Sequence, residues 1–346
     1  MRLLVLGGGG FLGHHVVAAA RAAGHAVTVY SRSGDTPFRD VEALTGDRHG
    51  DLAPLAGRTW DAAVDTFTDT APGAPAVRAA GRLLSGSVGV YAYVSGMSVY
   101  APAGPAHPDE SAPVRRAGVE PDDDPLQERS LAKLAGEQAL AEVFDGPVLR
   151  PRVGIMVGPR DPTHRFTYWP RRLAGALAGS RPATVLVPGD PDRTVQYSDA
   201  RDTAAWVVAM VAAGRGGVFN TVGPGRPDTL AAVLRACLRA AGGDPDGGDG
   251  GTDGPVRFVR ADEGFLRERL ADVEEERRPL WYPEDQIPQT AIDSTAALAA
   301  GLRFRPAEET ARDVLAQARE TGEEGLDTAA FAERERALLA ALAGRG

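Results

Sequence analysis

The chain has a single cysteine, Cys237, among its 346 residues, which excludes an internal disulfide framework and a metal site built from cysteines. Cys237 falls on the apolar face of a helix predicted over residues 230–239, so we interpret it as a small buried hydrophobe. No apolar run is long enough to span a bilayer, and the apolar N-terminal stretch lacks the cleavage pattern of a signal peptide. These absences favour a cytoplasmic globular protein that does not contact a membrane.

An excess of positive charge and a metal-ligand pattern are lacking as well. The net charge of −9 gives no indication of nucleic-acid binding. The six histidines never fall at metal-ligand spacing with carboxylates, so we expect no catalytic metal. The hydrophobic content of 43% is typical of a globular protein, and the length exceeds that of one compact core. A small molecule is therefore the expected partner.

Glycine is abundant at one place, directly after the first predicted strand. Residues 1–6 form an apolar run, four glycines occupy positions 7–10 with a fifth at Gly13, and an amphipathic helix is predicted over residues 14–23. A strand, a glycine turn and a helix are the context that a dinucleotide-binding loop needs, because glycine lets the backbone approach a pyrophosphate at the positive end of the helix. The alternative is a tight turn without a ligand.

The second predicted strand, residues 25–30, ends without the acidic residue that binds a ribose hydroxyl in NAD-binding loops. It ends instead in Tyr30, Ser31, Arg32 and Ser33. A guanidinium group beside two hydroxyls suits a 2′-phosphate in charge and in geometry. The pattern favours NADP over NAD as the cofactor, with an ordinary solvated arginine as the alternative for Arg32.

Strands and helices alternate through the first ninety-five residues, with strands predicted over 60–66 and 88–95 and a helix over 74–84. Right-handed crossovers then stack the strands into one parallel sheet, which gives an α/β fold with a Rossmann-type doubly wound sheet. We expect a dinucleotide-binding domain over residues 1–160 plus about 190–225. A smaller α/β substrate domain is expected over about 161–189 plus 226–320, with a linker at 242–254 and a C-terminal helical tail at 321–346.

A set of short segments shares one family pattern; these segments are Gly7–Gly13, Gly46–Arg48, Trp60–Asp65, Tyr93–Ser95, Ser98–Tyr100, Leu149–Pro151, Val157–Pro159, Val195–Asp202 and Gly217–Pro224. On these segments the chain resembles an extended short-chain dehydrogenase/reductase of the NAD-dependent epimerase/dehydratase type. The resemblance covers residues 1 to about 225, and about 226 to 320 more loosely. It implies a Rossmann fold and a dinucleotide cofactor, whereas function is a weaker inference because one fold hosts many chemistries.

The resemblance also implies which residues contact the cofactor. It assigns Asp47 to the adenine amine, with a turn or cap role as the alternative. It places the segment after the fourth strand, and the backbone of residues 151–153, along the cofactor. The predicted cofactor-binding residues are Gly7, Gly10, Phe11, Leu12, Gly13, Ser31, Arg32, Asp47, Arg48, Thr66, Phe67, Ser95, Lys133, Pro151 and Val153.

The catalytic pattern is where the chain departs from the family. Relatives place a serine three residues before the Val-Tyr pair, and a Tyr-x-x-x-Lys on the next helix. Here the serine position holds Gly96, and the helix predicted over residues 126–140 carries Lys133 with Arg129 four residues before it. No tyrosine occurs between Tyr100 and Tyr168, so another alignment does not restore the pattern.

Arginine stays protonated in proteins, so Arg129 can hold an anion or polarise an oxygen but cannot cycle as an acid and base. Lys133 is the remaining candidate for proton transfer; the alternative is that it only holds the nicotinamide ribose. Ser95 and Ser98 are candidate hydrogen-bond donors. The predicted substrate-binding residues are Gly96, Met97, Ser98, Arg129, Arg165, Tyr168 and Trp169.

The last three of these belong to an aromatic segment, residues 161–170, for which a core position in the second domain is the alternative. The predicted function is an NADP(H)-dependent oxidoreductase that acts on a polar small molecule. A non-redox isomerase or cyclase, or a protein that only binds a ligand, is the alternative, with the dinucleotide site kept as a scaffold. A homodimer through the helices at 74–84 and 126–140 is permitted by their alanine-rich faces.

Overall fold

A computed structural model describes residues 1–67, 73–119, 127–245, 255–273, 278–283, 291–322 and 329–344. The linker predicted over residues 242–254 falls largely outside these ranges. The chain divides into two compact units. The first comprises residues 1–155, 200–225 and 291–304, and the second comprises residues 156–199, 226–290 and 305–346.

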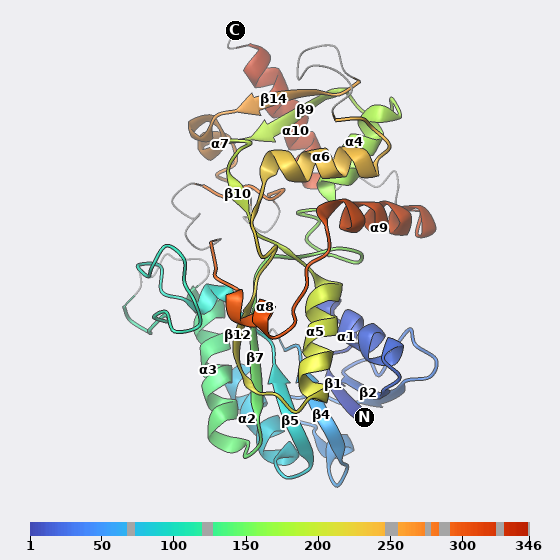
Figure 1. The fold of residues 1–346 in the computed structure, drawn as a ribbon, viewed down its shortest axis with the longest axis vertical. Helices are drawn as coiled ribbons and strands as arrows, with labels where there is room; N and C mark the ends of the chain where they lie inside the picture. The colour runs from blue at the N-terminus through green and yellow to red at the C-terminus, as the bar shows by residue number, and fades with distance from the viewer. Residues whose placement is uncertain are drawn as a thin grey trace. The chain divides into compact units, whose positions relative to one another are not determined.

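A parallel sheet forms the centre of the first unit, in the order β3-β2-β1-β4-β5-β7-β12 (Figure 1). Its strands are β1 Arg2–Leu6, β2 Ala26–Ser31, β3 Glu42–Thr45, β4 Trp60–Asp65, β5 Val88–Tyr93, β7 Val148–Val153 and β12 Gly217–Thr221. Residues 3–6 of β1 are fully buried, as expected where helices cover both faces of a parallel sheet. The predicted fold class, a Rossmann-type doubly wound parallel sheet, is confirmed.

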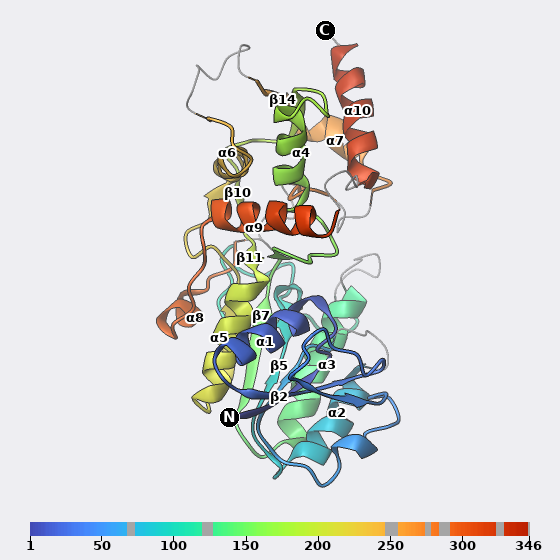
Figure 2. The same cartoon turned by 90° about the vertical axis from the view of Figure 1, so that its right-hand side faces the viewer.

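Helices flank both faces of this sheet. Helices α1 Phe11–Ala22 and α5 Ala200–Ala212 pack together on one face, and α2 Gly73–Leu84 and α3 Gln127–Val143 pack together on the other (Figures 1 and 2). Large apolar side chains from the sheet and from α2 and α3 make one buried cluster, to which Leu4, Trp60, Tyr91, Leu140 and Phe144 belong. The helices therefore hold the carboxyl ends of the strands in fixed positions, where a dinucleotide binds in such sheets.

Short elements complete the first unit; they are η1 Ala53–Leu55, β6 Ser95–Gly96, η2 Met97–Val99 and α8 Thr295–Ala299. Strand β6 pairs in parallel with β7, so that Gly96 lies opposite Val153. Helix α1 begins at Phe11, three residues before the predicted start, and Gly13 forms part of its first turn. Glycine is a poor helix former, and its place there is explained by its contact with the glycine loop, described below.

The second unit is built on a parallel pair of strands, β9 Thr184–Pro188 and β14 Arg257–Ala261. Its helices are α4 Tyr168–Leu177, α6 Leu230–Ala240, α7 Glu263–Arg269, α9 Ala307–Glu320 and α10 Ala329–Ala343. Two short pairs, β8 Met156–Val157 with β11 Ser198–Asp199 and β10 Thr194–Val195 with β13 Asp228–Thr229, complete it.

A buried ion pair fixes the C-terminal helix α10 within the second unit. Arg172 Nε on α4 donates to Glu335 Oε2 on α10 at 2.6 Å, and Glu335 Oε1 accepts from the amide of Leu186 on β9 at 2.9 Å. Cys237 on α6 is fully buried, and burial raises the pKa of its thiol, which agrees with its interpretation as a core residue. Among the described residues no helix is both long and apolar enough to cross a membrane.

Candidate functional site

The glycine loop between β1 and α1 closes tightly on itself. Gly7 has a φ of +93°, a conformation that favours glycine, and its amide donates to the carbonyl of Tyr30 at 3.0 Å. A side chain at Gly7 would lie 2.6 Å from Thr66 Oγ1, and one at Gly13 would lie 2.2 Å from the carbonyl oxygen of Gly7. Glycine is therefore required at both positions so that the helix can begin directly against the loop.

Gly9 and Gly10 are exposed, and neither is required by the packing of the chain. A side chain at Gly9 would meet no atom within 4 Å, and one at Gly10 would meet only the carbonyl of Gly7, at 3.5 Å. Gly10 has a φ of −75°, which any residue adopts. A ligand that approaches the backbone explains these glycines, and α1 has neither a side-chain cap nor an acidic residue in its first turn. The loop therefore fits a pyrophosphate.

The residues predicted to bind the adenosine half lie beside this loop. Ser31 ends β2, and its hydroxyl accepts from the amide of Gly34 at 3.2 Å. Arg32 follows and is exposed. Asp47 is exposed too, and its carboxylate accepts from the amide of His49 at 3.0 Å, so it has a turn role whether or not it contacts an adenine.

Arg48, predicted from the sequence to bind the cofactor, forms a buried ion pair that the sequence did not predict. Its guanidinium group donates two parallel hydrogen bonds of 2.6 Å to the carboxylate of Asp65, which is fully buried at the end of β4. The hydroxyl of Tyr91 on β5 donates to the same carboxylate at 2.8 Å. These donors hold the pKa of Asp65 below its ordinary value in spite of its burial.

Phe67 joins this ion pair to the predicted catalytic lysine. Its amide donates to Asp65 Oδ1 at 3.0 Å, and its ring lies 4.1 Å from the guanidinium carbon of Arg48. Its carbonyl oxygen accepts a hydrogen bond from Lys133 Nζ, which also donates to the carbonyl of Val94 at 2.9 Å. The structure thus brings Arg48, Phe67 and Lys133 together, at the carboxyl ends of β4 and β5.

Lys133 is almost completely buried on α3, with 8% of its surface exposed. The pKa of its amine is lowered to about 8. Burial is the largest cause; the positive charges of Arg129 and Arg48 also lower the pKa, and Asp65 and Glu137 raise it. The amine can therefore change its protonation state near neutral pH. This property is what general acid–base catalysis requires of a side chain.

Lys133 is also the only lysine in the chain; all of the other basic residues among the 38 lysines and arginines are arginines. The composition alone contains this signal. Arginine cannot change its protonation state, so Lys133 is the only one of the 38 lysine and arginine side chains that can release its proton. Asp65 and Tyr91 were not predicted as site residues, although an aspartate directly after the apolar residues 62–64 at the end of a strand is an unusual pattern.

Gly96, which the sequence pattern assigns to the position of the family's serine, has an extended backbone with a φ of −146°. A side chain there would meet nothing closer than the carbonyl of Val153 at 3.7 Å. Packing therefore does not exclude a serine from this position. The neighbouring Ser95 is buried, and its hydroxyl has no hydrogen-bond partner within the described part of the chain.

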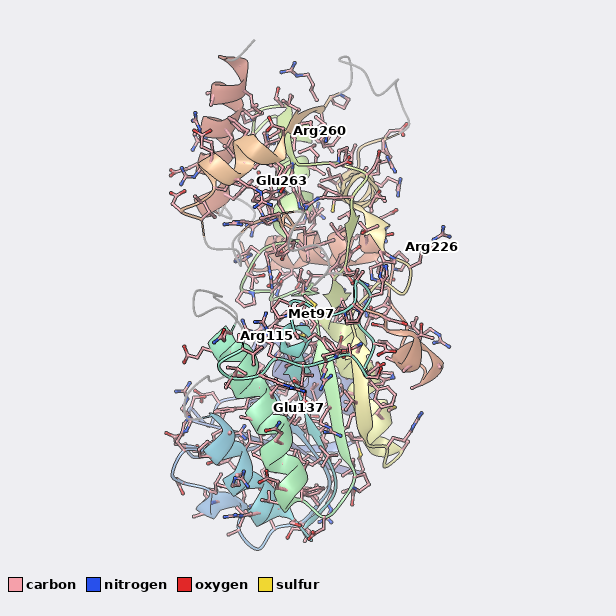
Figure 3. All side chains as sticks on the ribbon, turned by 90° about the vertical axis from the view of Figure 1, so that its left-hand side faces the viewer. Met97, Arg115, Glu137, Arg226, Arg260 and Glu263 are labelled. Atoms are coloured by element: carbon pink, nitrogen blue, oxygen red, sulfur yellow. The ribbon has the colours of Figure 1, made fainter. Side chains whose placement is uncertain are left out.

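The other predicted neighbours of the reaction lie around the same strand ends. Arg129 is exposed in the first turn of α3, one turn before Lys133. Met97 packs against a small apolar cluster around Tyr100, and the carbonyl of Ser98 accepts from Arg115 Nε at 2.8 Å. Figure 3 shows Met97 and Arg115 above Glu137, which lies on α3 one turn after Lys133.

Glu137 belongs to a second buried ion pair of the first unit. It accepts from Arg152 Nε at 3.1 Å and from a terminal nitrogen of Arg152 at 2.9 Å. Arg152 lies on β7 between the predicted cofactor residues Pro151 and Val153, and its guanidinium group lies 5.0 Å from the ring of Tyr100. The hydroxyl of Tyr100 donates to Asn220, so this tyrosine has a structural partner.

Two of the predicted substrate residues in the second unit lie in its core. Tyr168 and Trp169 are 2% and 0% exposed, and their rings meet edge to face at 5.0 Å. Trp169 donates from its indole nitrogen to the carbonyl of Pro279 at 3.2 Å. These contacts favour the alternative, core packing, over the lining of a pocket. Arg165 is partly buried and donates to the hydroxyl of Tyr282 at 3.2 Å.

Solved structures with the same fold are similar over nearly the whole chain. UDP-glucose 4-epimerase from Bifidobacterium longum, in complex with NAD⁺ and UDP, is 18% identical with a TM-score of 0.62, covering 94% of this chain and 100% of that one. The human epimerase family protein SDR39U1 with NADPH is 18% identical with a TM-score of 0.59, covering 91% and 99%. UDP-glucuronic acid 4-epimerase from Bacillus cereus, in complex with NAD, is 16% identical with a TM-score of 0.58, covering 93% and 99%.

No curated protein matches the chain. The family described as "NAD dependent epimerase/dehydratase family" matches residues 3–222, which is more than half of the chain. This match includes the glycine loop, the Arg48–Asp65 pair and the helix that carries Lys133. The chain therefore belongs to the NAD dependent epimerase/dehydratase family, as its sequence motifs predicted.

Proposed function

We propose that the chain is an NADP(H)-dependent oxidoreductase that acts on a polar small molecule, with Lys133 at the chemical centre in place of the family's tyrosine. The observation that carries the proposal is the placement of the only lysine of the chain. Its amine is buried at the ends of β4 and β5, and its pKa is lowered to about 8. A buried, titratable amine beside a dinucleotide site is typical of a catalytic position.

The cofactor would lie along the carboxyl ends of the strands. The backbone of Gly7–Gly13 would hold the pyrophosphate, and Arg32 would bind a 2′-phosphate. Thr66, Phe67, Pro151 and Val153 would line the nicotinamide half. When bound there, the nicotinamide supplies a position that accepts or donates hydride. The preference for NADP rests on the exposed cation of Arg32 at the end of β2.

Lys133 would move the proton that accompanies hydride transfer. A protonated lysine has three N–H groups, and two of them here are bonded to the carbonyls of Phe67 and Val94. The third N–H is left to donate to an oxygen of the ribose or of the substrate. With a pKa of about 8, the amine can also be regenerated as a base within one catalytic cycle.

The substrate is proposed to be a nucleotide sugar or a similar oxygen-rich molecule. Two of the similar structures are named as 4-epimerases of UDP sugars, and one of them contains bound UDP. The chain covers 100% and 99% of their lengths. Arg129 stays protonated at the position of the family's tyrosine, and a fixed positive charge there favours an anionic or oxygen-rich group.

Turnover with nucleotide sugars, followed through the nicotinamide absorbance, tests the proposal. The unmodified chain should bind NADPH, and it should either reduce NADP⁺ with at least one nucleotide sugar or oxidise NADPH with a derived ketone. Lys133→Met should abolish the change in absorbance, whereas Arg116→Met, which alters an exposed arginine of the first unit, should not. Binding of NADPH without turnover on any of these substrates would reject the oxidoreductase and leave a binding protein.

A non-redox isomerase or cyclase is the second candidate, and one observation favours it. Gly96 leaves room for a side chain and none is present, so the hydroxyl that relatives use at this point is missing without a packing reason. In this case product would form from a nucleotide sugar while the bound nicotinamide kept its oxidation state throughout. Rapid mixing that finds no transient change in absorbance during turnover would select this function.

A further inference from the structure

The carboxylate of Asp65 is fully occupied inside the protein. It accepts two hydrogen bonds from Arg48, one from Tyr91 and one from the amide of Phe67. An isolated buried ion pair is weak evidence for stability, because removing both charges from water costs about as much as their attraction returns. A role in placing a neighbouring group is a physical reason to keep such a pair.

The neighbouring group that this pair places is Phe67. Asp65 binds the amide of Phe67, Arg48 lies over its ring at 4.1 Å, and Lys133 binds its carbonyl oxygen. The residue is thus held at its amide, its ring and its carbonyl by three different charged side chains. A shift of the ion pair would move the carbonyl, and the amine of Lys133 would move with it.

We propose that Arg48 and Asp65 are positioning residues for Lys133: the ion pair holds Phe67, and Phe67 presents the carbonyl oxygen to which the amine is bound. The inference rests on the proposed role of Lys133 as the proton-transferring group. It assigns Arg48 and Asp65 a function through Lys133, in addition to the cofactor contact that the sequence predicts for Arg48.

The charges around Lys133 give this proposal a distinctive consequence. Asp65 at the end of β4 raises the pKa of the lysine, and Arg48 from the loop after β3 lowers it. On its own helix, Arg129 lowers the pKa and Glu137 raises it, and on β5 the ring of Tyr93 lies 5.2 Å from the amine. The two halves of the ion pair therefore act on Lys133 in opposite directions.

A pH titration of the full-length protein can measure this directly. Lysine labelled with ¹³C and ¹⁵N gives one side-chain signal, because Lys133 is the only lysine of the chain. Arg48→Met should raise the titration midpoint of this signal and Asp65→Asn should lower it, each by about one pH unit. Arg172→Met, which breaks a buried ion pair of the second unit, is the matched control and should leave the midpoint unchanged.

Shifts of the two variants in the same direction, or no shift in either, would overturn the proposal, because two opposite charges held close to the amine must move its pKa in opposite directions. The double variant Arg48→Met/Asp65→Leu tests the positioning itself, because it removes the contacts to Phe67 without changing the net charge. It also serves if either single variant fails to fold, since buried pairs often tolerate replacement by apolar side chains. Its relaxation should show a mobile Lys133 side chain. A rigid side chain in the double variant would also overturn the proposal.

The titration contains neither cofactor nor substrate, so its result is independent of the proposed activity. Opposite shifts together with a mobile Lys133 in the double variant, but without turnover on any substrate, would reject the function and keep the positioning of the lysine. Turnover that depends on Lys133, with a rigid Lys133 in the double variant, would keep the function and reject the positioning.

Discussion

The amine of Lys133 donates a hydrogen bond of 2.9 Å to the carbonyl oxygen of Val94, which directly follows strand β5. This bond joins helix α3 to the carboxyl end of β5, directly before the short strand β6 that Ser95 and Gly96 form. The sequence pattern assigns Lys133 to the family's lysine and Arg129 to the position of a tyrosine one turn earlier on the helix. Substitutions at these two positions test this assignment.

The stability of the protein should depend on pH through Lys133. The pKa of the amine is about 8 in the folded chain and returns to its ordinary value of 10.5 on unfolding. Between these values the unfolded chain binds one proton more than the folded chain, so the free energy of unfolding rises with pH, by up to about 3 kcal/mol. Below pH 8 both states hold the proton, and the penalty of burying the charge is present in full.

Denaturant unfolding of the wild type and Lys133→Met at several values from pH 7 to pH 11 measures this effect. Other groups titrate in the same range, so the quantity to follow is the difference in unfolding free energy between the two proteins. The unfolding free energy of the wild type should increase relative to that of the variant as the pH rises above 8. A difference that is constant across the range would show that folding does not lower the pKa of the lysine.

Substitution of Lys133 should separate proton transfer from cofactor binding. Lys133→Arg keeps a positive charge but cannot release its proton, so turnover should fall by about 100-fold or more while NADPH still binds. Lys133→Met should lose turnover as well and bind NADPH more weakly only if the amine holds the ribose. Fluorescence titration with NADPH and single-turnover kinetics give the two quantities. Full activity in Lys133→Arg would exclude proton transfer by this side chain.

The family pattern allowed most of the first unit to be predicted. The sheet was predictable because β1 is a continuous apolar run before a glycine turn, and the match of the family over residues 3–222 confirms the identification. The predicted start of α1 is three residues late, because the sequence pattern counts Gly13 as part of the glycine turn. Gly13 is helical because it packs directly against Gly7, and this contact is visible only in the structure.

The centre of the candidate site was harder to predict, for a physical reason. Asp65 and Arg48 are 17 residues apart, and nothing in either local pattern states that the two side chains meet in the core. Tyr168 and Trp169 show the converse: aromatic side chains suit a pocket and a core equally, and only their burial favours the core. Long-range pairing of charges and the choice between core and pocket depend on contacts that a sequence pattern does not contain.

Arg32 should determine the choice of cofactor. A charged hydrogen bond to a 2′-phosphate contributes about 1.5–3 kcal/mol, which corresponds to roughly a 10-fold to 150-fold preference for NADPH over NADH. Arg32→Ala should remove this preference and leave the affinity for NADH unchanged. Arg39→Ala, which removes another exposed arginine after the same strand, is the control. Equal affinities of the wild type for the two nucleotides, measured by calorimetry, would contradict the assignment.

A serine should be accepted at position 96. Gly96 is extended, and its nearest neighbour to a new side chain lies at 3.7 Å, so Gly96→Ser should change the free energy of unfolding by less than about 1 kcal/mol. Gly13→Ser is the contrasting control. Its side chain would lie 2.2 Å from the carbonyl oxygen of Gly7, so dinucleotide binding should be lost.

Restoring the family's catalytic pair should therefore require two substitutions. Arg129→Tyr alone should not give an efficient alcohol dehydrogenase, because the hydroxyl that shares the substrate oxygen is missing at Gly96. Gly96→Ser/Arg129→Tyr restores both hydroxyls, and Lys133 is in place one turn after the tyrosine to lower its pKa. The double variant should exceed both single variants in nicotinamide reduction with sugar-derived alcohols by more than the product of their separate effects. Activity of Arg129→Tyr equal to that of the double variant would show that the serine position is not part of the chemistry in this chain.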